Sequence, residues 1–207
     1  MSLVDQQPRA ESKNIVAVGE ERKLAILFAD IRGFTAFSES LPPYDVVHVL
    51  NKYFHAVGQP IEQSGGYIDN YMGDGLMALF GLRDDDASPV LRALQAAVGM
   101  LAAVDRLKPC LHGVFEQSFD IGIGIHYGHA VVGSVGAIGR ERVTAIGDAV
   151  NVASRIEAAN KLFGTRLLLS EEAHAQVASH AQFAATFETT LPGKGGSYKL
   201  IEVADLQ

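Results

Sequence analysis

Two aspartates lie at the ends of two short sequence segments, and their surroundings predict a shared metal site. Asp30 ends the hydrophobic run 24–30, and Asp74 lies between Gly73 and Gly75. A hydrophobic run that ends on an acid brings a carboxylate to the rim of a core, where it can bind a divalent cation. The glycines around Asp74 predict the tip of a tight hairpin. If the two tips meet in space, they form a site for divalent metal ions.

Asn151 and Arg155 form a second candidate group. They are four residues apart in a segment predicted to be helical, so both side chains point from the same face and can contact one ligand. A guanidinium is permanently charged and can fork onto two phosphate oxygens. The alternative for Arg155 is a surface salt bridge.

The turn at residues 32–35 is a candidate phosphate-binding segment because it precedes a short predicted helix. Exposed backbone N–H groups at a helix start attract phosphate oxygens. Gly33 lets the main chain approach a ligand, and Thr35 follows in the same turn. The side chain of Phe34 could equally anchor the core.

The elements that must position these residues can be read from hydrophobic periodicity and turn residues. Apolar residues at spacings of three and four predict a helix over 44–63, with Val46, Val47, Leu50, Phe54, Val57 and Ile61 facing the core. Pro42 and Pro43 begin this helix, and Gly65 and Gly66 end it. A second helix is predicted from the acids at 84–86 to about 107, and a third from an N-terminal cap at Asp148 to about 162.

Strands are predicted between these helices. Branched residues alternate with glycines over 119–126, which is typical of a strand that another element approaches closely, and Gly128 is expected to turn the chain into 130–135. The remaining predicted elements are strands at 23–30, 67–72, 76–80, 141–146, 166–169, 183–190 and 198–203 and a helix at 171–177. The order fits an α+β fold with a ferredoxin-like βαββαβ palm, in which helices pack on a mainly antiparallel sheet.

Composition sets the broad class. The chain has 207 residues, 48% of them hydrophobic, which suffices for one ordinary domain, and we expect a polar linker or arm at 1–20 and a catalytic domain at 21–207. The net charge of −7 provides no basic surface for nucleic acid. No segment has the length of a membrane span, and the single cysteine, Cys110, is expected to be a buried small side chain. The chain is predicted to be cytoplasmic and could be part of a longer protein with a flanking sensor or regulatory domain.

Five phrases in order resemble the signatures of class III nucleotidyl cyclases, over roughly 22–203. They are FADIRGFT at 28–35, GG at 65–66, GDG at 73–75, IGIGIH at 121–126 and AIGDAVNVASR at 145–155. The resemblance implies that ATP is cyclised to 3′,5′-cyclic AMP with release of pyrophosphate, using two divalent cations, Mg²⁺ or Mn²⁺, per site.

The resemblance also implies a role for each candidate residue. Asp30 and Asp74 match the metal ligands, and Ile31 would add its backbone carbonyl. The triphosphate would lie on Gly33, Phe34 and Thr35, with Lys194 reaching it from a loop that could equally be an ordinary exposed turn. Asn151 would position the ribose, and Arg155 would stabilise the transition state. In this family the metal ligands come from one subunit and the asparagine and arginine from the other, so a head-to-tail homodimer with two equivalent sites is expected.

Base recognition is where the sequence departs from the family pattern. Adenylyl cyclases place a lysine four residues before the hairpin aspartate and an aspartate, threonine or serine before the later Ile-Gly segment; here these positions hold Asn70 and Thr144. An amide and a hydroxyl can each donate or accept a hydrogen bond. Thr144 matches the threonine subclass and favours ATP, but a guanylyl or dual-specificity cyclase is the alternative.

Two other functional classes stay open from the sequence. One is a degenerate domain that binds nucleotide or dimerises with little catalysis, against which the intact Asp30, Asp74, Asn151 and Arg155 argue. The other is a diguanylate cyclase relative, whose hairpin would read Gly-Gly-Asp-Glu-Phe rather than Gly-Asp-Gly. His126 and His129 could suggest a transition-metal pair but are more often polar packing residues on a strand.

Overall fold

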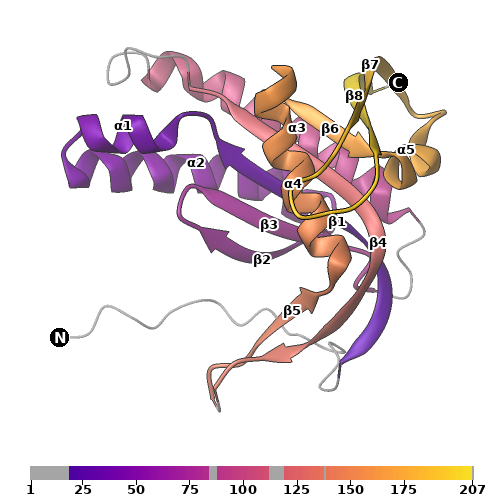
Figure 1. Cartoon of the computed structure of the whole chain (residues 1–207). Coiled ribbons are helices and arrows are strands. Elements are labelled where there is room, and N and C mark those ends of the chain that lie inside the picture. Colours follow the sequence, from indigo (N-terminus) through magenta and orange to yellow (C-terminus); the bar gives the residue numbers. More distant parts are fainter. Residues whose placement is uncertain (1–18, 84–87, 112–118, 138, 207) are drawn as a thin grey trace.

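A computed structural model describes residues 19–83, 88–111, 119–137 and 139–206 of the chain (Figure 1). The strands in these ranges are β1 (Glu20–Ile31), β2 (Tyr67–Met72), β3 (Gly75–Phe80), β4 (Ile121–Val135), β5 (Arg142–Ile146), β6 (Leu167–Ser170), β7 (Ala181–Thr189) and β8 (Tyr198–Leu206). The helices are α1 (Phe34–Ser40), α2 (Pro43–Gln63), α3 (Pro89–Leu111), α4 (Asp148–Phe163) and α5 (Glu171–Val177).

The centre of the molecule is an antiparallel sheet in the strand order β2-β3-β1-β4. This order and the helices between the strands confirm the predicted βαββαβ palm, with both α1 and α2 filling the first crossover. Beyond β4 the sheet continues with β6, which pairs in parallel, and then with β8 and β7. The sheet is therefore mixed but mostly antiparallel.

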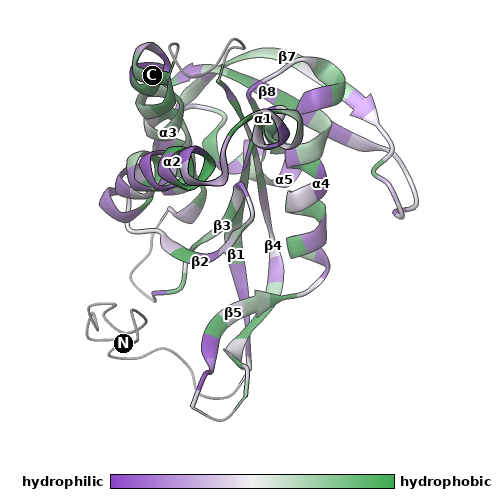
Figure 2. Cartoon of the chain, turned by 90° about the vertical axis from the view of Figure 1, so that its left-hand side faces the viewer, coloured by the Kyte–Doolittle hydropathy of each residue, from purple (hydrophilic) through white to green (hydrophobic). Residues whose placement is uncertain are grey.

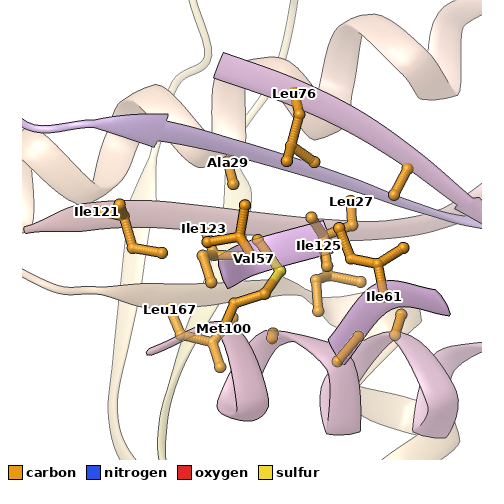
Figure 3. Packing of buried hydrophobic residues seen from close by; sticks show 14 of the residues in the cluster. Leu27, Ala29, Val57, Ile61, Leu76, Met100, Ile121, Ile123, Ile125 and Leu167 are labelled. Carbon is orange, nitrogen blue, oxygen red and sulfur yellow. The ribbon is translucent and has the colours of Figure 1, made fainter. Parts of the chain in front are cut away.

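The two faces of β1 contact different helices, because alternate side chains of a strand point to opposite faces. Leu27 and Ala29 belong to the large core with α2 and α3, where Val57 and Met100 pack against β1 and β4 (Figure 3). Leu24 and Ile26 belong to a second core with the start of α4. Asp30 follows the second alternation, so its side chain is on the α4 face of the sheet.

The buried stripe of α2 differs from the one predicted. Its buried side chains follow a spacing of four, Val49, Tyr53, Val57 and Ile61, whereas Val47 is exposed. Leu50, Phe54, Val57 and Ile61 of the predicted stripe do pack on the large core, and Tyr53 joins them. Its ring is fully buried and packs edge-on against Phe119 with centroids 5.9 Å apart.

Helix α4 lies directly on β4, and two glycines of that strand make this possible. A Cβ on Gly124 would lie 2.2 Å from the backbone nitrogen of Glu157, and one on Gly122 would lie 2.8 Å from its carboxylate. No side chain larger than hydrogen fits there. The structure therefore confirms the prediction of a strand that another element approaches closely.

The expected turn at Gly128 is wrong, because β4 runs without interruption from Ile121 to Val135. Leu24 of β1 stands opposite Gly128, so the ladder of β1 and β4 passes through this residue. The glycine is needed for packing rather than turning: a Cβ there would lie 2.8 Å from His126 Nε2 and 2.9 Å from Ala149 Cβ.

Three further predictions change. Gly147, not Asp148, precedes α4 as its N-cap residue, and Asp148 is the first residue of the helix. Cys110 is exposed rather than buried, because α3 extends past the predicted end at 107 and places it in the last turn. The acids at 84–86 and most of the arm at 1–20 lie outside the described residues. No helix in the described part is long and apolar enough to cross a membrane.

Candidate functional site

Asp30 and Asp74 come together where β1 ends beside the β2–β3 turn. The last pair of the β1–β3 ladder is Ala29 with Leu76, so the same register would place Asp30 opposite Gly75, the neighbour of Asp74. A Cβ on Gly75 would lie 3.3 Å from Asp30 Oδ1, and the two carboxyl groups are within hydrogen-bonding reach. The structure therefore brings the two predicted acids to one place.

The proximity of the two acids has an electrostatic cost. Burial, together with the hydrogen bond and charge of Asp30, raises the pKa of Asp74 to about 7. Two carboxylates at this distance resist ionising together, since each charge disfavours the other. A cation between them would remove this repulsion and hold both acids ionised.

The donor set fits hard divalent cations. Mg²⁺ typically binds through one or two carboxylates and keeps its remaining positions for water and substrate phosphates. In the described ranges no group of three or more His, Cys, Asp or Glu is arranged to hold a metal ion, so the protein ligands would be this pair. Ile31 follows Asp30 beyond the end of the β1–β3 ladder, and its backbone carbonyl is the third candidate oxygen.

Tyr53 of α2 adjoins the acid pair and was missed by the sequence analysis. Its hydroxyl is buried and has no hydrogen-bond partner among the described residues. Burial, and then the charges of Asp30 and Asp74, raise the pKa of Tyr53 far above its usual value. Tyr53 is therefore a neutral phenol in the core on the α2 side of the sheet.

Glu157 of α4 is a third acid near the pair. Burial and the charge of Asp30 raise the pKa of Glu157 to about 7, and Arg32 opposes this rise. The carboxylate of Glu157 and the guanidinium of Arg32 both lie against Gly122, which pairs with Asp30 in the sheet. Arg32 also donates a 2.8 Å hydrogen bond to the carbonyl of Thr165. The glycine pattern of β4 indicated a close neighbour, but not that an acid of α4 would reach Asp30.

The predicted phosphate turn precedes α1 as expected. Gly33 is the N-cap residue with φ 68°, a left-handed conformation that favours glycine, and a Cβ there would meet nothing within 4 Å. Phe34 packs on Phe37 with ring centroids 5.7 Å apart and contacts the large core, whereas Thr35 is exposed. The Phe34 ring is thus a packing group, and the open backbone at Gly33 is what a phosphate could reach.

Asn151 and Arg155 lie on α4 as predicted. Asn151 is exposed, and Nη1 of Arg155 is buried without a hydrogen-bond partner among the described residues. The other end of the Arg155 guanidinium lies against Gly193 in the β7–β8 loop, where a Cβ would be 3.4 Å from Nη2. The expected alternative of a surface salt bridge is not present for Arg155 in the described part of the chain.

Lys194 lies in the same loop, beside the start of α4. Its ammonium group forms an ion pair with Asp148, whose side chain is 71% exposed. Lys194, Gly193 and Arg155 therefore form a basic group held by α4 and one loop. Asp148 is a neighbour that the sequence analysis placed only as a helix cap.

The residues predicted to read the base lie on β2 and β5, two strands that do not pair with each other in the sheet. Asn70 of β2 stands opposite Met77, and Thr144 of β5 stands opposite Gly133 and is buried. Tyr67 donates a 3.2 Å hydrogen bond to the carbonyl of Val143, which ties β2 to β5. Asp69, another residue that the sequence analysis did not consider, is buried beside Thr144.

The acid pair and the basic group are not joined within the described part of the chain. No hydrogen bond or ion pair recorded there connects Asp30 or Asp74 with Asn151, Arg155 or Lys194. His126 and His129 are not a metal pair either. His126 is buried with Nδ1 2.9 Å from Ser170 Oγ, and His129 is exposed with Nδ1 3.6 Å from Glu21.

Comparisons with known proteins match this chain to one family. The profile described as "Adenylate and Guanylate cyclase catalytic domain" matches residues 16–201. An adenylate cyclase of Anabaena cylindrica is 40% identical over 166 residues, which are 75% of this chain but only 31% of that protein. The chain therefore spans about a third of this longer relative.

Two solved structures are similar over nearly the whole chain. The guanylyl cyclase Cya2 has a TM-score of 0.85 and 32% identity, covering 91% of this chain and 95% of that one. The adenylyl cyclase CyaB from P. aeruginosa has a TM-score of 0.83 and 27% identity, covering 91% and 96%. Both specificities therefore occur among similar structures.

Proposed function

This chain belongs to the adenylate and guanylate cyclase catalytic-domain family, and from this membership we propose that it converts ATP to 3′,5′-cyclic AMP and pyrophosphate. The observation that carries the proposal is the approach of the Asp30 and Asp74 carboxyl groups at the end of β1. The 3′-oxygen of the ribose forms a bond to the α-phosphorus, the bond to the β-phosphate oxygen breaks, and pyrophosphate leaves with its negative charge.

The acid pair supplies the metal half of this chemistry. Two divalent cations, Mg²⁺ or Mn²⁺, would polarise the 3′-hydroxyl and neutralise the triphosphate when bound. Asp30 and Asp74 would hold them, with the carbonyl of Ile31 as a further oxygen ligand. The backbone at Gly33, Phe34 and Thr35 contacts phosphate oxygens.

The basic group supplies the other half. Asn151 positions the ribose, and the unpaired Nη1 of Arg155 donates to phosphate oxygens as charge develops in the transition state. Lys194 binds the triphosphate after exchanging Asp148 for a phosphate oxygen. In this proposal the phosphate oxygens of the ligand accept the hydrogen bonds that Arg155 and Lys194 donate.

The two halves meet across a head-to-tail homodimer in this proposal. One chain carries both an acid pair and a basic group that do not contact each other, so two copies related by a twofold axis would build two complete sites. The β4–β5 arm, which extends away from the body of the molecule in Figures 1 and 2, exposes Val131, Val135 and Ile146. Exposed apolar side chains on a projecting hairpin support burial against a second copy.

ATP is favoured as the substrate because Thr144 and the named adenylate cyclase of Anabaena point the same way. Asn70 and the guanylyl cyclase Cya2 support the alternative of GTP or dual specificity. A flanking sensor or regulatory domain in a longer parent protein is consistent with the length of the Anabaena relative.

The test is direct. Purified protein is incubated with ATP or GTP in Mg²⁺ or Mn²⁺, and the cyclic products are separated from the substrates, with Asp30→Ala alongside. We expect cyclic AMP from the wild-type protein and almost none from Asp30→Ala. A domain that binds nucleotide without turning it over, or an Asp30→Ala protein as active as wild type, would refute the proposal.

A further inference from the structure

Asp69 of β2 is a buried acid whose surroundings leave its carboxylate poorly hydrogen-bonded. Its residue surface is 7% exposed, and neither carboxylate oxygen makes a hydrogen bond of ordinary geometry among the described residues. Buried polar groups nearly always have partners, since an unpaired one keeps the full cost of losing water. This carboxylate belongs to neither the acid pair at Asp30 nor the basic group at Arg155.

A β-bulge explains where Asp69 points. The pairing of β2 with β3 shifts between Ile68 and Asn70, so Asp69 is the extra residue of β2. Bulges occur next to functional sites, where they redirect a side chain that regular alternation would place on the other face. Asp69 and its neighbour Asn70 are thereby presented together rather than on opposite faces of the sheet.

The same segment is fixed against β5. The hydrogen bond from the Tyr67 hydroxyl to the carbonyl of Val143 is 3.2 Å long and ties β2 to β5. Asp69 and Thr144, both buried, lie on these two segments and interact through the carboxylate and the hydroxyl. Burial raises the pKa of Asp69, and the Thr144 hydroxyl opposes this rise by favouring the charged carboxylate. A buried acceptor thus lies next to a hydroxyl that could donate to it.

We propose that Asp69 is a positioning residue that accepts the single proton of the Thr144 hydroxyl and so leaves only oxygen lone pairs for the nucleotide base. An ionised carboxylate can only accept hydrogen bonds, and a hydroxyl has one proton to give. Adenine carries an exocyclic amine, a donor, where guanine carries a carbonyl, an acceptor. Thr144 held as an acceptor therefore selects ATP over GTP. This inference rests on the proposed function, because it concerns the base of the same substrate.

The proposal assigns discrimination to Asp69 and Thr144 rather than to Asn70. An amide offers both a donor and an acceptor and can turn to suit either base. An acceptor fixed by a buried carboxylate cannot adapt in this way. The carbonyl oxygen of guanine would face the lone pairs of the Thr144 hydroxyl with no proton between the two oxygens. A polar site rejects a ligand that leaves its polar groups unpaired in this way.

The experiment measures the ratio of kcat/KM for ATP to that for GTP. In Asp69→Asn the amide can donate to Thr144, which frees the hydroxyl proton to face a guanine carbonyl, and we expect the ratio to fall by about tenfold. Thr144→Val should lower the ratio to a similar extent, and Thr144→Ser should preserve it. Adding Asp69→Asn to Thr144→Val should change nothing further, because the route through the hydroxyl is already gone.

Controls separate this role from a structural one. Asp45→Asn removes an exposed acid in the first turn of α2 and should leave the ratio unchanged. Asp69→Ser, whose hydroxyl can also donate to Thr144, gives a second variant if Asp69→Asn does not fold. An unchanged ratio in a folded Asp69 variant, or an equal change with and without the Thr144 hydroxyl, would overturn the inference. A wild-type protein that cyclises neither nucleotide would instead overturn the proposed function.

Discussion

The acid pair and the basic group of this molecule are built in opposite ways. The acid pair lies where neighbouring strands end, so the hydrogen-bonded register of β1 and β3 fixes Asp30 and Asp74 at a distance that they resist when ionised. The basic group lies on one helix and one loop, and Nη1 of Arg155 has no partner in the described part. One region gathers negative charge, and the other gathers hydrogen-bond donors that carry positive charge.

The difference indicates which ligand each region requires. Repelling carboxylates on a rigid sheet edge suit metal ions, whose positions must be exact. An unpaired guanidinium and a lysine held only by the exposed Asp148 suit an anion that arrives and leaves. A metal-bound triphosphate carries both complementary charges. In the proposed dimer the two regions are two halves of one site, and each prediction below disturbs one half.

The largest effect is expected from removing a member of the acid pair. Asp30→Ala or Asp74→Ala should lower kcat by about 10³-fold or more, because charge on the attacking and leaving oxygens would be left without its cations. Product formation at saturating ATP measures this. Neither variant should unfold more easily at pH 8, since each removes one of two repelling carboxylates. Near-normal turnover in either variant would contradict the metal assignment.

Removing the guanidinium of the other half should cost somewhat less. Arg155→Ala should lower kcat by about 10²-fold to 10³-fold with little change in KM, because its donors act mainly on charge that develops in the transition state. Its midpoint of thermal unfolding should stay close to that of wild type, since Nη1 makes no hydrogen bond. Arg155→Lys keeps the positive charge but cannot donate two parallel hydrogen bonds, so its kcat should lie between those of wild type and Arg155→Ala. Arg106→Ala, an exposed arginine of α3, is the matched control; loss of activity there would show that the effect is not specific to the site.

The acid pair should also make stability depend on pH and metal. Burial and Asp30 raise the pKa of Asp74 to about 7 from 3.8, so between these values the folded chain binds more protons than the unfolded one. This contribution favours folding below pH 4 and is lost as the pH rises through 7. In EDTA, the midpoint of thermal unfolding should therefore fall over this window more steeply for wild type than for Asp30→Ala.

Divalent cations should reverse that trend. Mg²⁺ or Mn²⁺ at a hundred times its Kd should stabilise the folded chain by about 2.7 kcal/mol near pH 8 and have no such effect on Asp30→Ala. Equal stabilisation of both proteins by the metal would place its binding site elsewhere.

The smallest effect is expected at the ion pair of the basic group. Asp148→Asn releases Lys194 from its carboxylate partner, so KM for ATP should fall by about twofold to fivefold with kcat unchanged, since the exposed carboxylate of Asp148 binds the lysine only weakly. Lys194→Ala should raise KM. If neither substitution moves KM, Lys194 does not contact the triphosphate.

The meeting of Asp30 and Asp74 could be predicted because both acids end segments whose periodicity marks adjacent strands of a common plan. The shared face of Asn151 and Arg155 followed from helical spacing alone. Such local signals carry through to the structure because main-chain geometry dictates them.

Other features depended on long-range packing that local patterns do not encode. A glycine such as Gly128 can either form a turn or make room for a close neighbour. Only the pairing of β4 with β1 shows that Gly128 makes room for a neighbour. Asp69 is directed toward Thr144 by a bulge, which inserts one residue without a sequence marker. Tyr53 and Glu157 belong to helices on opposite faces of the sheet, and the charges of the acid pair act on both, a proximity that requires the folded sheet.

The central claim is that one acid pair and one basic group from different copies complete a site. Asp30→Ala keeps the basic group and Arg155→Ala keeps the acid pair, so a heterodimer of the two, isolated by different affinity tags, contains one intact site. We predict that each homodimer is nearly inactive and that the heterodimer recovers about half of the wild-type activity per dimer. A heterodimer as inactive as its parents would contradict the account and would place both halves of the site in a single chain.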